Sequence, residues 1–236
     1  MKQFAAFLAS AFFCVAAAAV PLAPGQTVSV ADNNGNPFTP SPVAGDTNGL
    51  FTNLTIEVNG SNVGVAAGLF SLNYNNGSGW EQLLAFCLSP DVWLQPFDNP
   101  YTVHALSSSP HAAVSGLISE FWGRFRNQVT NDVNAAAFQV GLWELAFDAG
   151  AGINLAGGNF RFTTSGAVLS TAQSWLSQLD GTGPRANLVV LIDNPSTNVR
   201  RQDLVTEVPE PGTLALLGAA VLLLAAVGRL SGLSAR

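Results

Sequence analysis

Alternation of apolar and polar side chains predicts a series of strands in the first half of the chain. Residues 50–59 alternate in a way that is typical of a strand with one buried face. The Asn59-Gly60 dipeptide is a hairpin-turn signal, so we expect residues 63–74 to return as a second strand paired with the first. Residues 82–88 form a shorter apolar run, which we also assign to a strand.

The middle of the chain changes to helical periodicity. Apolar residues recur at intervals of three and four, which predicts helices over residues 114–129, 134–147 and 165–179. Further strands are expected at residues 159–163 and 187–193. This order of strands, helices and strands predicts an α+β domain, in which a β-strand layer carries an inserted helical segment.

The N-terminus has the composition of a secretory signal. Lys2 supplies one positive charge, the run from Phe4 to Ala19 is apolar, and the last residues of this run are small. The pattern is typical of a signal peptide over residues 1–19 that is removed after export. An uncleaved anchor helix is the alternative, and until any cleavage a signal helix precedes the domain.

The C-terminus ends in an apolar run with basic residues behind it. Residues Thr213–Val227 carry no charge, and Arg229 and Arg236 follow them. At ~1.5 Å per residue this run covers roughly 22 Å, against about 30 Å of hydrocarbon in a bilayer. We therefore expect a short C-terminal transmembrane helix over residues 213–227, with the bulk of the chain outside the cytoplasm.

A proline-containing motif precedes this apolar run. Its residues are Val208-Pro209-Glu210-Pro211. The motif, the apolar run and the basic end, in this order, resemble the PEP-CTERM sorting tail over residues 208–236. The resemblance implies an exosortase-type transpeptidase that cuts near the motif, in a bacterium that makes exopolysaccharide. It also implies a protein held in the membrane before sorting, then displayed at the cell surface or released to the extracellular matrix.

The basic end departs from the arginine cluster that is usual in this family, since it holds only Arg229 and Arg236. An ordinary tail anchor is therefore the alternative interpretation. In either case the working part of the chain is expected outside the cytoplasm.

The two ends leave room for one domain with a sizeable core. We divide the rest of the chain into a loop-rich stretch at residues 20–49, a folded domain at residues 50–193 and a linker at residues 194–207. The linker is a polar stretch that could begin with an edge strand. Residues 20–208 carry fourteen acidic residues against six arginines. An acidic surface repels phosphate backbones, so we expect no nucleic-acid partner.

Cysteine use singles out one position. Cys14 leaves with the signal peptide, so Cys87 is the sole cysteine of the exported chain. An unpaired cysteine outside the cytoplasm is a buried inert thiol, an intermolecular bridge or a reactive group. The residues around Cys87 are needed to choose between these three.

Two short motifs connect Cys87 with a glutamine on the second predicted helix. They are Phe86-Cys87-Leu88 and Phe138-Gln139-Val140-Gly141-Leu142-Trp143. Together they resemble the bacterial thioester domains of surface adhesins and of related PEP-CTERM proteins, over residues 50–193. The resemblance implies that the Cys87 sulfur is joined to the side-chain carbonyl of Gln139, with loss of ammonia. The supporting positions implied in the same way are Phe86, Phe138, Gly141 and Trp143. The family usually has Ala where this chain has Gly141.

The function that this resemblance implies is attachment rather than turnover. An amine or hydroxyl of a partner protein or polysaccharide would capture the thioester as an amide or an ester. One alternative is a non-reactive structural or matrix protein of the exopolysaccharide layer, and another is a hydrolase that uses Cys87 with His104 or His111. The sequence shows no enzyme motif and no cluster of metal ligands, so we expect no turnover enzyme, no cofactor and no metal site.

Overall fold

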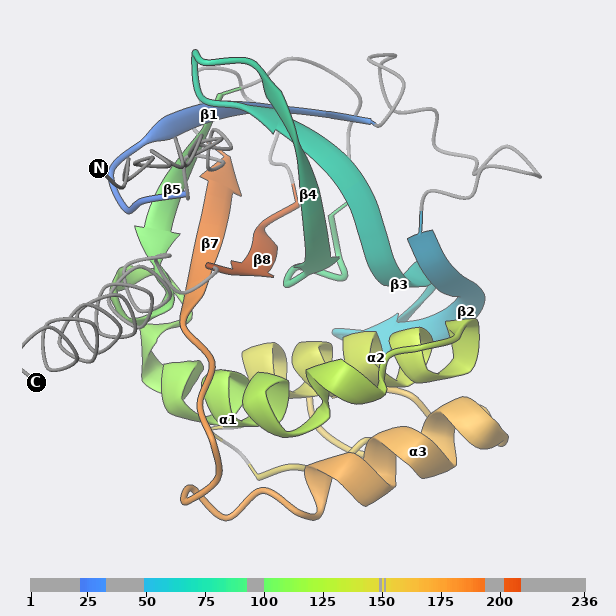
Figure 1. Cartoon of the computed structure of the whole chain (residues 1–236). Helices are drawn as coiled ribbons and strands as arrows, with labels where there is room; N and C mark the ends of the chain where they lie inside the picture. Colours follow the sequence, from blue (N-terminus) through green and yellow to red (C-terminus); the bar gives the residue numbers. More distant parts are fainter. Residues whose placement is uncertain are drawn as a thin grey trace, which may run out of the picture.

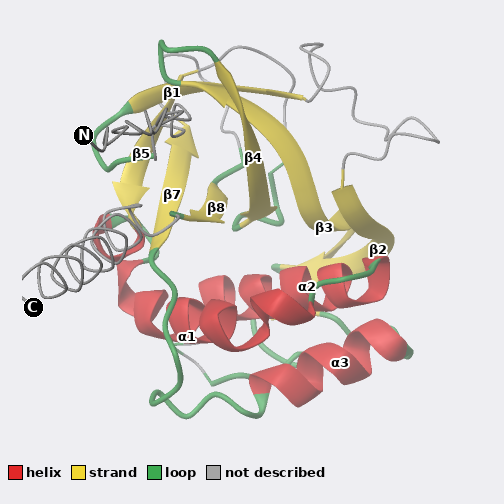
Figure 2. Ribbon diagram, viewed as in Figure 1, coloured by secondary structure: helices red, strands yellow, loops and turns green. Residues whose placement is uncertain are grey.

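Strands form one end of the molecule and helices the other (Figure 1; Figure 2). The computed structural model describes residues 22–32, 49–92, 100–148, 150, 152–193 and 202–208. The strands are β1 (Thr27–Asp32), β2 (Gly49–Val58), β3 (Ser61–Asn75), β4 (Trp80–Cys87), β5 (Pro100–Ala105), β6 (Phe160–Arg161), β7 (Leu188–Asp193) and β8 (Leu204–Glu207). The α-helices are α1 (Ser115–Phe125), α2 (Asp132–Asp148) and α3 (Ala167–Leu176), and the 3₁₀ helices are η1 (Leu106–Ser108), η2 (Ala112–Val114) and η3 (Arg126–Gln128).

Six of the strands close into a barrel. Their order is β1-β5-β7-β8-β4-β3, and β3 pairs back onto β1. Residues 72–75 of β3 lie between β1 and β4, whereas residues 61–70 pair with β2. β2, followed by β6, therefore continues the sheet beyond the barrel wall.

The barrel corrects the predicted fold class. We expected an α+β layer with an inserted helical segment, but the structure is a six-stranded β-barrel with few helices. Two strands cause the difference. β1, within the stretch expected to be loop-rich, pairs with both β3 and β5. β8, in the stretch expected to be a linker with at most an edge strand, lies between β7 and β4 and closes the barrel wall.

The helices expected at the two ends of the chain, over residues 1–19 and 213–227, lie outside the described residues. Within the part of the chain that the structure describes, no helix is both long and apolar enough to cross a bilayer.

The hairpin predicted at the Asn59-Gly60 turn is confirmed. β2 and β3 pair antiparallel over the whole length of β2. Asn59 has a φ of 50° and Gly60 a φ of 80°, and positive φ at both central residues is typical of a type I′ turn. The three predicted helices correspond to α1, α2 and α3, and the strands expected at residues 159–163 and 187–193 correspond to β6 and β7.

The helices pack together against the barrel, with α2 at the centre. α2 contacts α1 and α3 as well as β2, β3 and β4, and all of its residues from Ala135 to Leu145 are buried. Aromatic rings fill the space between these elements. The ring centroid of Phe138 in α2 lies 4.8 Å from that of Phe121 in α1 and 4.7 Å from that of Phe86 in β4. A helix buried on all sides is therefore the element that presents residues to the end of β4.

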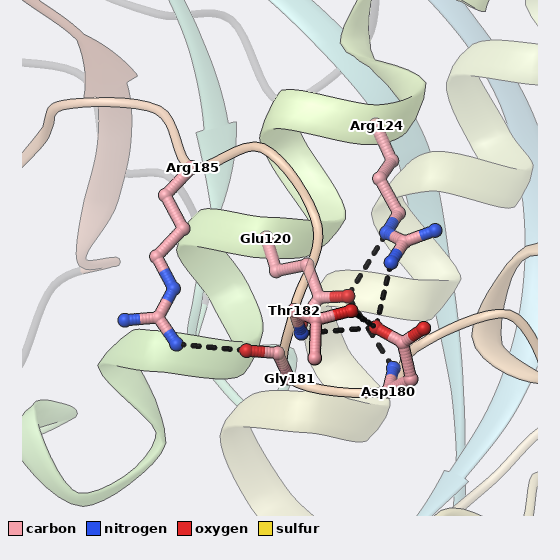
Figure 3. Close-up of polar contacts among 6 residues, drawn as sticks. All are labelled: Glu120, Arg124, Asp180, Gly181, Thr182 and Arg185. Atoms are coloured by element: carbon pink, nitrogen blue, oxygen red, sulfur yellow. Dashed lines mark hydrogen bonds and ion pairs between the residues drawn. The ribbon is translucent and has the colours of Figure 1, made fainter.

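A polar network fastens the loop after α3 to α1 (Figure 3). Glu120 is fully buried, and its Oε1 accepts hydrogen bonds from Arg124 Nε at 2.9 Å and from the backbone N–H of Asp180 at 3.3 Å. Asp180 Oδ1 accepts from the hydroxyl and N–H of Thr182 and from Arg124 Nη2. The bonds from Thr182, helped by the charge of Arg124, lower the pKa of Asp180 to about 2. The network holds the loop that leads to β7 against the helices.

Candidate functional site

Cys87 is the last residue of β4, and Gln139 lies in the middle of α2. The side-chain amide of Gln139 bonds the backbone of Cys87 in both directions. The N–H of Cys87 donates to Gln139 Oε1 at 2.9 Å, and Gln139 Nε2 donates to the carbonyl oxygen of Cys87 at 2.6 Å. Both residues are buried. The structure thus brings together the two residues that the sequence motifs single out.

Gln139 occupies a position beside Cys87 that β3 leaves vacant, because β3 turns away from β4 before it reaches Cys87. β3 pairs with β4 as far as Phe70 with Ala85, and its remaining residues pair with β2 instead. Leu88 donates its N–H to the carbonyl of Asp203 on the β8 side. Since backbone groups alternate in direction along a strand, Cys87 directs its N–H and C=O to the side that β3 has left. The amide of Gln139 takes the place of a strand there.

The predicted supporting residues are buried in the same core as the pair. Phe86 and Phe138 are fully buried and Trp143 is 1% exposed. The ring of Trp143 packs 6.0 Å from that of Phe160, measured between centroids. Gly141 lies directly against the ring of Phe121. Cys87 and Gln139, which are 3% and 0% exposed, thus lie in the core out of reach of bulk water.

Burial also determines the protonation state of the Cys87 thiol. It raises the pKa of Cys87 well above its ordinary value. Because the thiolate is the reactive form of cysteine, a thiol that stays protonated is a poor nucleophile towards molecules in solution. Any reaction of Cys87 depends on a carbonyl carbon that is held beside it and polarised.

Neither histidine is placed to act on Cys87. His111 Nε2 lies 3.4 Å from Asp203 Oδ2. Cys87 pairs with Leu204 across the sheet, so Asp203, one residue before Leu204, directs its side chain to the opposite face. His104 lies in β5, whose neighbours are β1 and β7 rather than β4. The geometry gives the hydrolase hypothesis no base beside Cys87.

The residues that the structure describes include no group of three or more His, Cys, Asp or Glu side chains able to hold a metal ion. Cys87 is the free cysteine of this part of the chain.

Sequence analysis misses two buried carboxylates on α2. Glu144 Oε1 accepts the backbone N–H of Asn154. Asp148 Oδ1 and Oδ2 accept the backbone N–H groups of Asn159 and Phe160, at 3.0 Å and 2.6 Å. The two side chains thereby hold the loop between α2 and β6. The signal that could have found them is an acidic pair, four residues apart in an apolar helix, ahead of a glycine-rich loop whose N–H groups need acceptors.

Comparison with known proteins bears on the C-terminal end of the chain. Residues 207–236 match the PEP-CTERM protein-sorting motif. The sorting tail predicted at residues 208–236 is thus confirmed, and Val208, Pro209, Glu210 and Pro211 fall within it. Apart from residues 207 and 208, the matched segment lies outside the described residues.

The sorting motif supports an exported protein that is associated with the cell surface or envelope and is a substrate of exosortase. Proteins with this motif are substrates of sorting and not enzymes, as predicted. Membrane anchoring before sorting stays a prediction. No curated protein and no solved structure matches the chain.

Proposed function

We propose that this exported chain is a binding module that attaches covalently to a partner through a thioester between Cys87 and Gln139. The observation that supports the proposal is the two-way hydrogen bonding between the Gln139 amide and the Cys87 backbone. These bonds fix the Gln139 carboxamide at the residue whose sulfur would attack it, which lowers the entropy that the reaction has to lose. Display at the envelope, as the sorting motif indicates, would expose such a module to partners outside the cell.

In the proposed reaction the Cys87 sulfur attacks the carboxamide carbon of Gln139. Negative charge develops on Oε1, which already accepts the Cys87 N–H at 2.9 Å, so this donor acts as an oxyanion hole. The carbon–nitrogen bond then breaks, and the thiol proton leaves with the nitrogen as ammonia. An amine or hydroxyl of the partner later captures the Gln139 acyl group and frees the Cys87 thiol.

The same hydrogen bonds have a structural use, which favours a second candidate. They satisfy backbone groups of Cys87 that β3 leaves unpaired, and departure of Nε2 as ammonia would remove the donor to the Cys87 carbonyl. A buried acceptor without a partner costs about 1–3 kcal/mol. The second candidate is a non-reactive structural or matrix protein of the extracellular polymer layer.

Intact mass of the exported chain separates the two candidates. We expect the wild-type protein to be lighter than its sequence by one ammonia and to gain one methylamine when it is treated with that amine. Gln139→Glu is the matched control, because it keeps Oε1 as an acceptor but has no ammonia to lose. Cys87→Ala removes the sulfur, and both variants should show the plain masses of their sequences.

A freshly folded wild-type protein with the plain mass, and with a thiol that reacts fully after unfolding, would rule out the thioester. The structural candidate would then stand.

A further inference from the structure

β2 leaves one edge of the sheet open. It pairs with β3 along its whole length. On its other side the pairs among the described residues are those of Glu57 and Val58 with Arg161 and Phe160 of β6. From residue 49 to residue 56 the described part of the chain supplies no strand on that side. Figure 1 shows β2 at the outer margin of the sheet, away from β5 and β7. We call this side of residues 49–56 the β2 edge.

Odd-numbered residues direct their backbone groups outward along the β2 edge. The two-residue turn makes Val58 and Ser61 a hydrogen-bonded pair, and such pairs alternate along an antiparallel ladder, so the even-numbered residues bond β3. The N–H of Asn59, which donates outward to the carbonyl of Asn159 at 2.7 Å, follows the same alternation. The outward-directed residues beyond the reach of β6 are Gly49, Phe51, Asn53 and Thr55.

The β2 edge lacks the features that usually prevent the addition of another strand. Natural sheet edges are protected by charged side chains, by proline or by bulges. Residues 49–56 contain no charged residue and no proline, although the chain carries a net charge of −6. Leu50 and Leu54 are only partly buried against the core. The β2 edge is therefore a neutral and partly apolar strip on an acidic protein.

We propose that the β2 edge pairs with the same edge of a second copy of this chain. Two antiparallel β2 strands related by a two-fold axis at Thr52 bring their outward N–H and C=O groups into register. Each copy presents the same strip, so the contact closes on itself as a dimer and does not grow into a fibre.

The charges and apolar residues of β2 favour this register. Leu50 lies opposite the second copy's Leu54, so each covers exposed surface of the other. Glu57 and Arg161, which bond each other at 2.9 Å, lie beyond the paired segment. No like charges then face one another across the two-fold axis, which is a requirement for self-pairing in an acidic protein.

Sedimentation of the exported chain over a range of concentrations tests the proposal. Asn53 is exposed, and its N–H points away from β3. Asn53→Pro removes this donor from the edge without removing a bond to β3, and should weaken dimerisation by roughly tenfold or more. Asn53→Ala is the matched control, because it truncates the same side chain but keeps the N–H, and should sediment as the wild type does. A wild type that stays monomeric at the highest concentration, or an Asn53→Pro protein that dimerises like the wild type, would overturn the proposal.

Cross-linking provides a test that does not depend on proline. In the proposed register Thr52 faces the second copy's Thr52 as a non-hydrogen-bonded pair, with Cα atoms about 4.5 Å apart, within the range that a disulfide spans. Thr52→Cys in a Cys87→Ala background should form a covalent dimer on mild oxidation. Thr55→Cys faces the second copy's Gly49 and should not. Equal cross-linking of both variants, or of neither, contradicts the register.

Discussion

Gly141→Ala should destabilise the protein by roughly 2 kcal/mol, because overpacking a core usually costs more than the helix propensity gained from alanine. A Cβ at this position would lie 3.0 Å from Cε1 of Phe121 and closer still to its Cζ. The Phe121 ring is fully buried between Phe138 and Phe125, at 4.8 Å and 5.4 Å between centroids, so it has little room to move. The loss is measured as the change in the unfolding free energy from urea denaturation.

Gly116→Ala is the matched control for this prediction. Gly116 lies in α1, and a Cβ there would meet only Arg185 Nη2, at 3.9 Å. Alanine at this position, the second residue of the helix, should therefore stabilise the protein slightly, by about 0.5 kcal/mol. Adding Phe121→Leu to Gly141→Ala should recover part of the loss. Equal effects of alanine at both glycines would show that Phe121 does not limit the size of residue 141.

The Gly141 result also bears on the proposed thioester. Residue 141 lies two positions after Gln139 on the same helix, so α2 can make room for a methyl group only by moving away from α1. Such a movement changes the distance between the Gln139 amide and the Cys87 backbone. Phe121 occupies the space that a methyl group at residue 141 would need, which explains why this position holds glycine.

The unfolding free energy of the wild-type protein should fall as the pH rises through neutrality, and Glu144→Gln should abolish this fall. Burial, and to a smaller extent the nearby charge of Asp148, raises the pKa of Glu144 to about 7, from 4.5. Between these two values the folded protein holds a proton that the unfolded chain has released. The unfolding free energy therefore falls from about pH 5 to about pH 8, by an amount on the order of 2 kcal/mol.

Denaturation at a series of pH values measures this slope. Glu144→Gln keeps the acceptor for the N–H of Asn154 and carries no charge, so its unfolding free energy should be higher than that of the wild type at pH 8. Glu57→Gln removes a partly exposed carboxylate that pairs with Arg161, and should retain the wild-type fall. A fall that persists in Glu144→Gln would place the titrating group elsewhere.

The elements that sequence analysis predicts correctly are those whose signal is local. The alternation before Asn59-Gly60 and the helical periodicity around Phe121 and Phe138 each arise within one segment, and the structure has β2, β3, α1 and α2 at these places. The prediction fails for β1 and β8. Both strands are short and pair with strands distant in the sequence, β1 with β3 and β5, and β8 with β4, which no local pattern records.

The candidate site is also predictable only where its signal is local. Cys87 and Gln139 can be proposed from their motifs, and the structure places them in contact. The reason for the contact is not visible in the motifs, since it depends on β3 leaving β4 after the pair of Phe70 and Ala85. The roles of Glu144 and Asp148 also depend on distant partners, because the N–H groups they accept belong to a loop that takes its position only when β6 pairs with β2.

The position of β8 determines when the barrel can close during export. β8 ends at Glu207, where the sorting motif begins, and Val208 still donates its N–H to the carbonyl of Asn187 at 3.0 Å. If the chain crosses the membrane from its N-terminus, β8 emerges after the other strands of the described barrel, and the gap between β7 and β4 stays open until then. The edge of β4 that carries Cys87 is covered by β8 in this same step. The segment that matches the sorting motif is therefore joined directly to the strand that completes the described barrel, with no linker between them.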